Sequence, residues 1–410
     1  MEQNTNLDIP LGERVQRYRE RRGLTQLALG GLVHRSEDWV SKVERGLLPV
    51  DRYSMLIELA RALDVADLAD LTGHPLAMST SETPEHASVA GIRAAMTRLP
   101  ALRGAALPGS PLAAEALGAR VKDAWSIYDT DTARYARLGP ALPELLGQAY
   151  KSVNAGGADA EAAARARIEV YQLLQVFLKR LGERELARTA ADRALTYATD
   201  LGDIVWMGAS AWNLGAIMLN RGEGDLALDL AREMIGMMTP IPDDATPEYI
   251  SVYGALHLVA VIASARSGNP GRGWDFLRQA DGVARRAGVD RNDFRTSFGP
   301  TNTLMHAVHL AGEEGDVAEA LRRADDVEIV PGALPLERTT RYLVEVMQAN
   351  RIAGDDLGTL YMLQKIEAQS PEEIRYFPVA REAVRDLVRK NKSIYRRDVR
   401  AMAGRLGVAV

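Results

Sequence analysis

The stretch LTQLALGGLVHRSEDWVSKVERG, residues 24–46, decides the fold of the N-terminal part of the chain. It predicts two short helices joined by a tight turn, the first over 27–33 and the second beginning at Ser36. The Ser36 hydroxyl can accept a hydrogen bond from an otherwise unpaired backbone N–H in the first helical turn. Gly46 follows the second helix, where glycine adopts a left-handed turn without steric strain. We therefore expect a helical hairpin over 24–46.

The second predicted helix has two different faces. At about 100° per residue, Val40 and Val43 fall on one side and can pack against Leu29 and Leu32 of the first helix. The other side carries the short or charged residues Asp38, Ser41, Lys42 and Arg45. A helix that enters a DNA major groove needs this division, although an ordinary helical hairpin shows the same periodicity.

The order of residues favours the DNA-binding alternative. L-T-Q opens the first helix and V-S-K-V-E-R-G ends the second, and this pattern resembles the helix-turn-helix domain of XRE-type regulators and phage repressors. The register holds over 24–46 without a gap. Further helices are predicted over 11–22, 52–64 and 68–71, which gives the five helices that the resemblance implies for a lambda-repressor-like domain. We place this domain at 1–73.

The resemblance also implies which residues meet DNA. These are Gln26, Ser36, Glu37, Asp38, Ser41, Lys42, Arg45 and Arg52. Lys42 could donate to guanine, and Glu37 or Asp38 could accept from cytosine, although either acid could simply cap the helix. Arg52 suits a minor-groove or backbone contact or a solvated position. Arg19 and Glu44 match a salt bridge of the family, which positions helices rather than binding DNA.

Composition sets the broad class of the protein. A chain of 410 residues exceeds one compact domain, and 6% aromatic residues with abundant Ala and Leu favour helix over sheet. The absence of cysteine excludes disulfides and iron–sulfur clusters. With no run of eighteen apolar residues and no signal sequence, we expect a soluble, cytoplasmic protein without membrane contact. No Walker loop, nucleophile elbow or dinucleotide fingerprint occurs, so we expect neither an enzyme nor a cofactor.

Net charge limits how DNA would be held. The chain carries a formal charge of −5, which argues against a general polyanion binder. Residues 1–73 hold ten Lys and Arg against twelve Asp and Glu, or −2, whereas residues 11–52 hold nine against six, or +3. A local positive field of this size predicts few phosphate contacts and dependence on a homodimer that reads a palindromic operator.

Beyond residue 89 a loose repeat appears, after a Pro-, Ser- and Thr-rich segment at 74–88 that reads as an interdomain linker. Five glycines at spacings of 40, 46, 47 and 39 residues each separate two helical stretches: Gly182, Gly222, Gly268, Gly315 and Gly354. A small or apolar residue follows five positions later each time. Such hairpins must stack to bury their apolar faces. The pattern resembles tetratricopeptide repeats, and the whole chain looks like actinobacterial-type XRE regulators.

The predicted fold is therefore all-α, with a helix-turn-helix domain followed by a right-handed tetratricopeptide-like α-solenoid over 89–410. In that family the first helix of each hairpin lines a concave groove. Registering the hairpins on their glycines predicts a groove lined by Gln172, Trp212, Asn220, Arg266, Asn302, Met305, His309, Arg341, Gln348 and Arg351. Amides suit a peptide backbone and arginine suits a carboxylate, although a solvated, empty groove is an equal alternative.

Two remaining features carry less weight. His306, His309 and Glu313 are spaced for a metal site, but isolated helical histidines more commonly pack, so no metal is expected. The seven basic residues within 389–405 could reach flanking DNA or form a solvated helix. The resulting hypothesis is a sequence-specific transcriptional regulator whose repeat domain dimerises and senses a peptide or small molecule. The alternative is a protein-interaction scaffold with little or no DNA binding.

Overall fold

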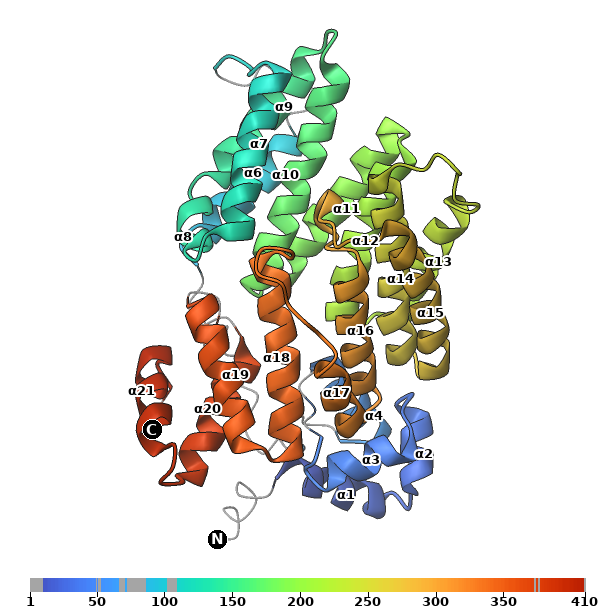
Figure 1. Ribbon diagram of the computed structural model, residues 1–410, viewed down its shortest axis with the longest axis vertical. Coiled ribbons are helices and arrows are strands. Elements are labelled where there is room, and N and C mark those ends of the chain that lie inside the picture. Colours follow the sequence, from blue (N-terminus) through green and yellow to red (C-terminus); the bar gives the residue numbers. More distant parts are fainter. Residues whose placement is uncertain are drawn as a thin grey trace.

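The computed structural model describes residues 10–48, 50, 53–65, 71, 86–101, 109–371, 374 and 377–408. All regular structure within these ranges is helical. A small N-terminal group of helices packs at one end of a larger array of helical hairpins (Figure 1). The all-α fold and its order, a helix-turn-helix domain followed by helical repeats, are confirmed.

The N-terminal domain contains α1 (Leu11–Arg21), α2 (Gln26–Leu32), α3 (Glu37–Glu44) and α4 (Tyr53–Ala62). Ser36 caps α3 by accepting from the Trp39 backbone N–H at 3.1 Å, and Gly46 has φ +70°. Val40 and Leu29 are fully buried. The expectation for Leu32 is wrong, because its side chain is 54% exposed. It is the last residue of a two-turn helix, and the buried Val33 that follows takes the inward position instead.

Two predicted segments fall largely outside the described residues. They are the closing helix over 68–71, of which only Leu71 is described, and the linker over 74–88, of which only 86–88 are described.

The repeat domain begins with four helices and continues as five hairpins. The first four are α6 (Val89–Ala101), α7 (Ala114–Thr130), α8 (Arg134–Leu138) and α9 (Leu142–Ala155). The hairpins are α10 (Ala160–Arg180) with α11 (Arg184–Leu201), α12 (Ile204–Asn220) with α13 (Gly224–Met237), α14 (Pro247–Arg266) with α15 (Pro270–Ala287), α16 (Pro300–Glu313) with α17 (Val317–Ala324), and α18 (Leu336–Ala353) with α19 (Asp356–Gln369). A 3₁₀ turn η1 (Asp293–Arg295) precedes α16, and α20 (Pro378–Lys390) and α21 (Arg396–Leu406) end the array.

The predicted hairpin units are confirmed by their turns. The five repeat glycines each join the two helices of one hairpin, with φ between +77° and +83°, a conformation that strains any residue with a Cβ. The residues five positions later are Ala187, Ala227, Ala320 and Thr359, all buried, and Gly273. A Cβ on Gly273 would lie 3.0 Å from the Val261 carbonyl oxygen of α14, the other helix of its hairpin. Small residues here let the two helices of each hairpin approach closely.

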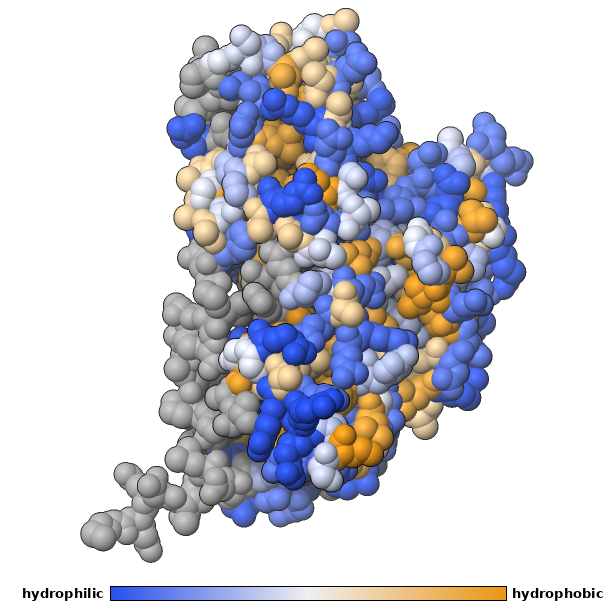
Figure 2. Space-filling model, turned by 60° about the vertical axis from the view of Figure 1, so that its left-hand side comes forward, coloured by the Kyte–Doolittle hydropathy of each residue, from blue (hydrophilic) through white to orange (hydrophobic). Residues whose placement is uncertain are grey.

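Helix α14 is the most deeply packed helix of the array, with Ile250 to Ala265 all buried. By length and composition it is apolar enough to cross a membrane, but 89% of its most apolar window is buried inside the protein. A helix buried in a protein core can have the same length and apolar composition. Figure 2 shows a surface on which hydrophilic side chains dominate and apolar ones form separate patches.

Candidate DNA-binding face and ligand cavity

A buried network fixes α3 against α1 and α2. Arg19 donates from Nε to Glu44 Oε1 at 2.5 Å and from Nη2 to Glu44 Oε2 at 2.9 Å. Gln26 Nε2 donates to the same Glu44 Oε2 at 2.7 Å. The Glu44 side chain is only 3% exposed, and its hydrogen bond raises the pKa of Arg19. Gln26, predicted as a DNA contact, thus helps hold the recognition helix in place.

The outward face of α3 carries the predicted base-facing residues. Glu37, Asp38 and Arg45 are exposed, whereas Ser41 and Lys42 are half-buried. Asp38 Oδ2 lies 2.7 Å from Lys42 Nζ, one helical turn away. Arg52 lies outside the described residues. The face therefore presents mixed charge, and its central cation is already paired within the helix.

Lys42 also contacts the repeat domain. Its Nζ donates to the Gly315 carbonyl at 2.8 Å, at the turn between α16 and α17. Arg35, in the turn before α3, donates from Nη1 to the Ala265 carbonyl at 3.0 Å, near the end of α14. A Cβ placed on Gly268 would lie 3.0 Å from the His34 carbonyl oxygen. The turns of two repeat hairpins therefore hold the helix-turn-helix unit along one edge of α3.

A cavity of about 300 Å³ lies between the two domains. The N-terminal domain contributes Arg35, Trp39, Leu48, Val50 and Met55, and the repeat domain contributes chiefly α16, α17 and α18. Trp39 is 8% exposed, with the Arg35 guanidinium 5.9 Å from its ring centroid. Trp39 therefore packs at the domain boundary.

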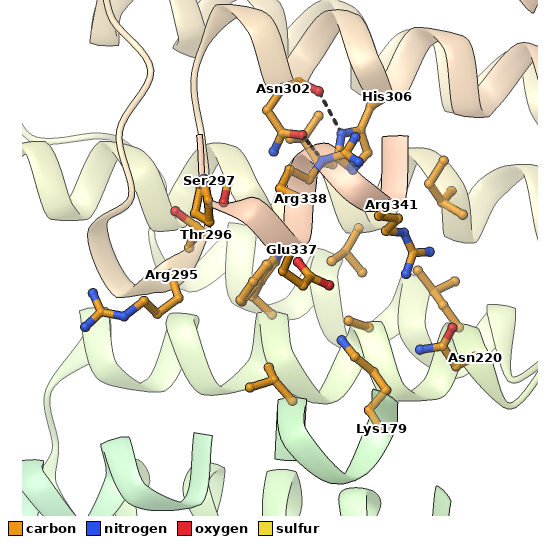
Figure 3. Close-up of a pocket in the computed structure, with 18 of the residues that line it drawn as sticks. Lys179, Asn220, Arg295, Thr296, Ser297, Asn302, His306, Glu337, Arg338 and Arg341 are labelled. Atoms are coloured by element: carbon orange, nitrogen blue, oxygen red, sulfur yellow. Dashed lines mark hydrogen bonds between the residues drawn. The ribbon is translucent and has the colours of Figure 1, made fainter. Parts of the chain in front are cut away.

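A second cavity, of about 140 Å³, lies on the inner side of the repeat array. Side chains from α7, α10, α12, α14, α16 and α18 surround it, with additional residues from the loop after η1. Figure 3 shows Lys179 and Arg341 pointing into this space from opposite sides, with Asn302, His306 and Arg338 grouped above it. We call it the central cavity.

Six of the ten predicted groove residues line the central cavity: Trp212, Asn220, Arg266, Asn302, His309 and Arg341. The other four lie elsewhere. Gln172 is buried and donates to Ser210 at 3.2 Å, and Met305 is fully buried in the core. Gln348 lines the interdomain cavity, and Arg351 pairs with Asp386 of α20 at 2.6 Å.

Sequence reasoning missed several residues of the central cavity. They are chiefly Trp125, Tyr128 and Asp129 of α7, Arg295 of η1, His306 of α16 and Arg338 of α18. Helix α7 precedes the first repeat glycine, and the loop around η1 has no counterpart in the other hairpins, so neither could be registered. Arg338 lies three residues before the predicted Arg341, so the two share one face of α18. This spacing could have identified Arg338 from the sequence.

A charged chain connects the two cavities. Arg266 Nη2 lies 2.8 Å from Glu313 Oε1, which lies 3.2 Å from His309 Nε2. His309 Nδ1 lies 3.4 Å from Glu345 Oε1, to which Arg341 Nε donates at 3.3 Å. His309 and Glu345 line both cavities. The two cavities therefore share an unbroken line of side-chain contacts.

Burial shifts the titration of other cavity groups. It raises the pKa of Asp129 to about 6, against the opposing effect of Arg295 and Arg134. Burial, reinforced by Arg338, lowers the pKa of His306 to about 3, and His306 Nδ1 lies 2.8 Å from the Asn302 carbonyl oxygen. Within the described ranges, no three His, Asp or Glu side chains are grouped to hold a metal ion.

Comparison with known proteins identifies a family for the N-terminal domain. Residues 10–72 match the helix-turn-helix domain family, and no curated protein matches the chain. Among solved structures, the chain is similar to Bacillus thuringiensis PlcR, crystallised in complex with the peptide PapR7 and DNA. The identity is 12%, the match covers 68% of this chain and 95% of that one, and the TM-score is 0.30.

Proposed function

We propose that this protein is a cytoplasmic, sequence-specific transcriptional regulator that binds double-stranded DNA through α3. The observation that carries this proposal is the geometry of residues 10–48. Ser36 caps α3, the Arg19–Glu44–Gln26 network fixes its orientation, and short polar side chains face outward. A fixed helix with such a face fits a major groove, where Lys42 suits guanine and Glu37 or Asp38 suits cytosine.

The protein acts as a homodimer on a palindromic operator. The support is energetic, because the small positive excess of residues 11–52 provides few phosphate contacts for one copy. Two copies on one DNA face need half-sites about 34 Å, or one helical turn, apart.

The repeat domain senses a peptide or small molecule and controls access to α3. While Lys42 donates to Gly315, its ammonium cannot also reach a base in the groove. Base contact by Lys42 therefore requires its side chain to leave Gly315, and release of the helix-turn-helix unit from the repeat turns would free it. A ligand shifts this balance only if it binds the docked and released arrangements with different affinity.

Footprinting of the full chain on the DNA upstream of its own gene tests the proposal. We expect a protected, twofold-symmetric site that disappears in the variant Ser41→Ala/Lys42→Ala. Lys365→Ala is the matched control, because Lys365 is an exposed lysine of α19, far along the chain from α3, and should leave the footprint unchanged. Absence of protection by folded protein at any concentration sinks the proposal.

The alternative is a protein-interaction scaffold, and the pairing of Lys42 with both Asp38 and Gly315 favours it. A scaffold would bind its partner through the repeat domain whether or not Lys42 is present. The double variant separates the two functions, because a scaffold loses nothing when Ser41 and Lys42 are replaced.

A further inference from the structure

The central cavity holds more cations than carboxylates. Its lining includes six cationic side chains, Lys179, Arg180, Arg266, Arg295, Arg338 and Arg341. Three carboxylates, those of Asp129, Glu337 and Glu345, share the lining. Six minus three leaves an excess of three positive charges within the part of the cavity that the structure describes. Unbalanced charge removed from water is costly unless a partner neutralises it.

Each carboxylate has a cationic partner. Asp129 lies 3.6 Å from Arg295, and Glu337 pairs with Arg180. Glu345 accepts from Arg341 at Oε1, while its Oε2 is buried without a hydrogen bond from the described residues. Arg266 is paired with Glu313, which lies outside the cavity lining. The excess charge therefore falls on Lys179 and Arg338.

These two cations lack full compensation. Over the described ranges, Lys179 Nζ has neither a hydrogen bond nor an ion pair, and its charged neighbours Arg180 and Arg341 repel it. Arg338 donates from Nε to Asn302 Oδ1 at 2.5 Å. Its Nη1, however, is buried without a hydrogen bond from the described residues and lies 4.0 Å from Glu345 Oε1. Lys179 of α10 and Arg338 of α18 both line the cavity, and each has a donor without an acceptor, with Arg338 Nη1 buried behind the cavity surface.

The pKa values of these cations are shifted in the direction expected for buried cations that lack an anionic partner. Burial, together with Arg180 and Arg341, lowers the pKa of Lys179 well below its usual value. Burial also lowers the pKa of Arg338 and of Arg341. A bound anion would reverse these shifts, because an opposite charge at close range favours the charged form.

The same cavity has an apolar wall. Trp212, Leu258 and Ile262 line it from α12 and α14, and the two aliphatic side chains are almost fully buried. A cavity of about 140 Å³ is close to the size that holds a benzene ring. An occupant must therefore combine a small apolar body with an anionic group.

We propose that the central cavity binds a carboxylate whose apolar body is about the size of a benzene ring or a leucine side chain. Lys179, Arg338 and Arg341 hold the carboxylate, and Trp212, Leu258 and Ile262 contact the body. Guanidinium and ammonium groups from two helices match the oxygens of a carboxylate. This inference rests on the proposed sensing function and names the chemical class of its ligand. A free organic acid and the C-terminal residue of a peptide share this chemistry.

The test is ligand-observed NMR, by saturation-transfer difference, on the full chain with matched probes. Benzoate represents a free acid and N-acetylleucine represents a peptide terminus, and benzamide and N-acetylleucinamide are their uncharged counterparts. Fragments of this size bind at about millimolar Kd, so each probe is titrated to about 10 mM. We expect at least one carboxylate to bind at least tenfold more tightly than its amide. Stronger binding of benzoate indicates a free organic acid as the ligand, and stronger binding of N-acetylleucine indicates a peptide C-terminus.

Three variants locate the site. Lys179→Met and Arg341→Met should each weaken the bound carboxylate by about tenfold or more, while Lys365→Met, which removes one exposed lysine of α19, should not change it. Circular dichroism shows that each variant retains its helices. Equal binding of acid and amide, binding that survives Lys179→Met and Arg341→Met, or no carboxylate-selective binding in the unsubstituted chain overturns the proposal.

DNA footprinting of the same Lys179→Met protein separates this proposal from the proposed function. An intact footprint with lost binding of the stronger carboxylate supports both. Carboxylate binding without any footprint in the unsubstituted chain overturns the regulator and leaves the cavity assignment in place. A footprint without carboxylate-selective binding overturns the cavity assignment and leaves the proposed regulator in place.

Discussion

The recognition face of α3 and the central cavity both gather charged side chains, but they balance the charge differently. On α3, Lys42 is paired with Asp38 at 2.7 Å and donates to Gly315, and beneath it Arg19 is paired with Glu44. In the central cavity, six cations meet three carboxylates, and the Lys179 ammonium faces other cations. The central cation of the α3 face therefore has partners in both domains, whereas the central cavity holds cations without full compensation.

This difference bears on how each region is stabilised. A buried ion pair with complete hydrogen bonding fixes geometry, and it becomes costly only when one partner is removed. An incomplete set of charges costs stability from the start, and a ligand recovers part of that cost. Changes in the N-terminal domain should therefore mainly destabilise it, and changes in the cavity should mainly alter its response to pH or ligand.

The largest effect is expected for Glu44→Ala. It leaves the buried Arg19 guanidinium without its bidentate acceptor and removes the acceptor of Gln26. We expect the free energy of unfolding of the N-terminal domain to fall by about 3–5 kcal/mol, measured by urea titration. Glu20→Ala is the matched control, because Glu20 faces the same Arg19 at 3.6 Å but is 57% exposed. It should cost less than about 1 kcal/mol. Equal losses would show that the network does not hold α3.

A smaller effect is expected for His306 in the cavity. Its pKa falls from an unfolded value of 6.5 to about 3, so the folded state binds fewer protons between these values. The stability that its neutral form contributes is present above pH 6.5 and is lost as pH falls toward 3. The slope is about 1.4 kcal/mol per pH unit. We expect His306→Asn to remove this slope from urea unfolding measured at pH 7, 6 and 5.

The exposed His34 of the α2–α3 turn provides the control on the other side of the comparison. His34→Asn makes the same substitution at an exposed position outside the cavity, so the difference between the two variants isolates the contribution of the buried ring. If His306→Asn follows the unsubstituted protein at all three pH values, the buried, neutral state of His306 is contradicted.

Local chemistry explains what could be predicted from the sequence. Ser36 as a cap and the glycines of the repeat turns act within four or five residues, so their effect on the chain is visible without the fold. Predicting which side chains line the cavity requires the exact register of each helix, because a shift of one residue rotates a side chain by about 100° around the helix axis. The predicted Met305 is therefore buried in the core, while its neighbour His306 lines the cavity.

The contact between Lys42 and Gly315 had no sequence signal at all. The acceptor is a backbone carbonyl, which every residue has, and it lies 273 positions along the chain. The Arg35 contact with the Ala265 carbonyl is of the same kind, at a separation of 230 positions. Only the stacking of the hairpins brings these turns beside α3, so the face predicted for DNA could not be recognised as a domain contact.

The smallest expected effect tests that contact through Gly268→Ala. The new Cβ would lie 3.0 Å from the His34 carbonyl oxygen and disturb the docking of the helix-turn-helix unit. If docking competes with DNA, the loss of about one hydrogen bond's worth of contact, 0.5–1 kcal/mol, raises operator affinity about two- to fivefold. Gly182→Ala is the matched control, because Gly182 occupies the same turn in the α10–α11 hairpin at φ +83° and its Cβ would meet nothing within 4 Å. Both substitutions carry the same left-handed strain, so a gel-shift difference between them isolates the domain contact. Equal operator affinity in the two variants would show that the repeat turns do not restrain α3.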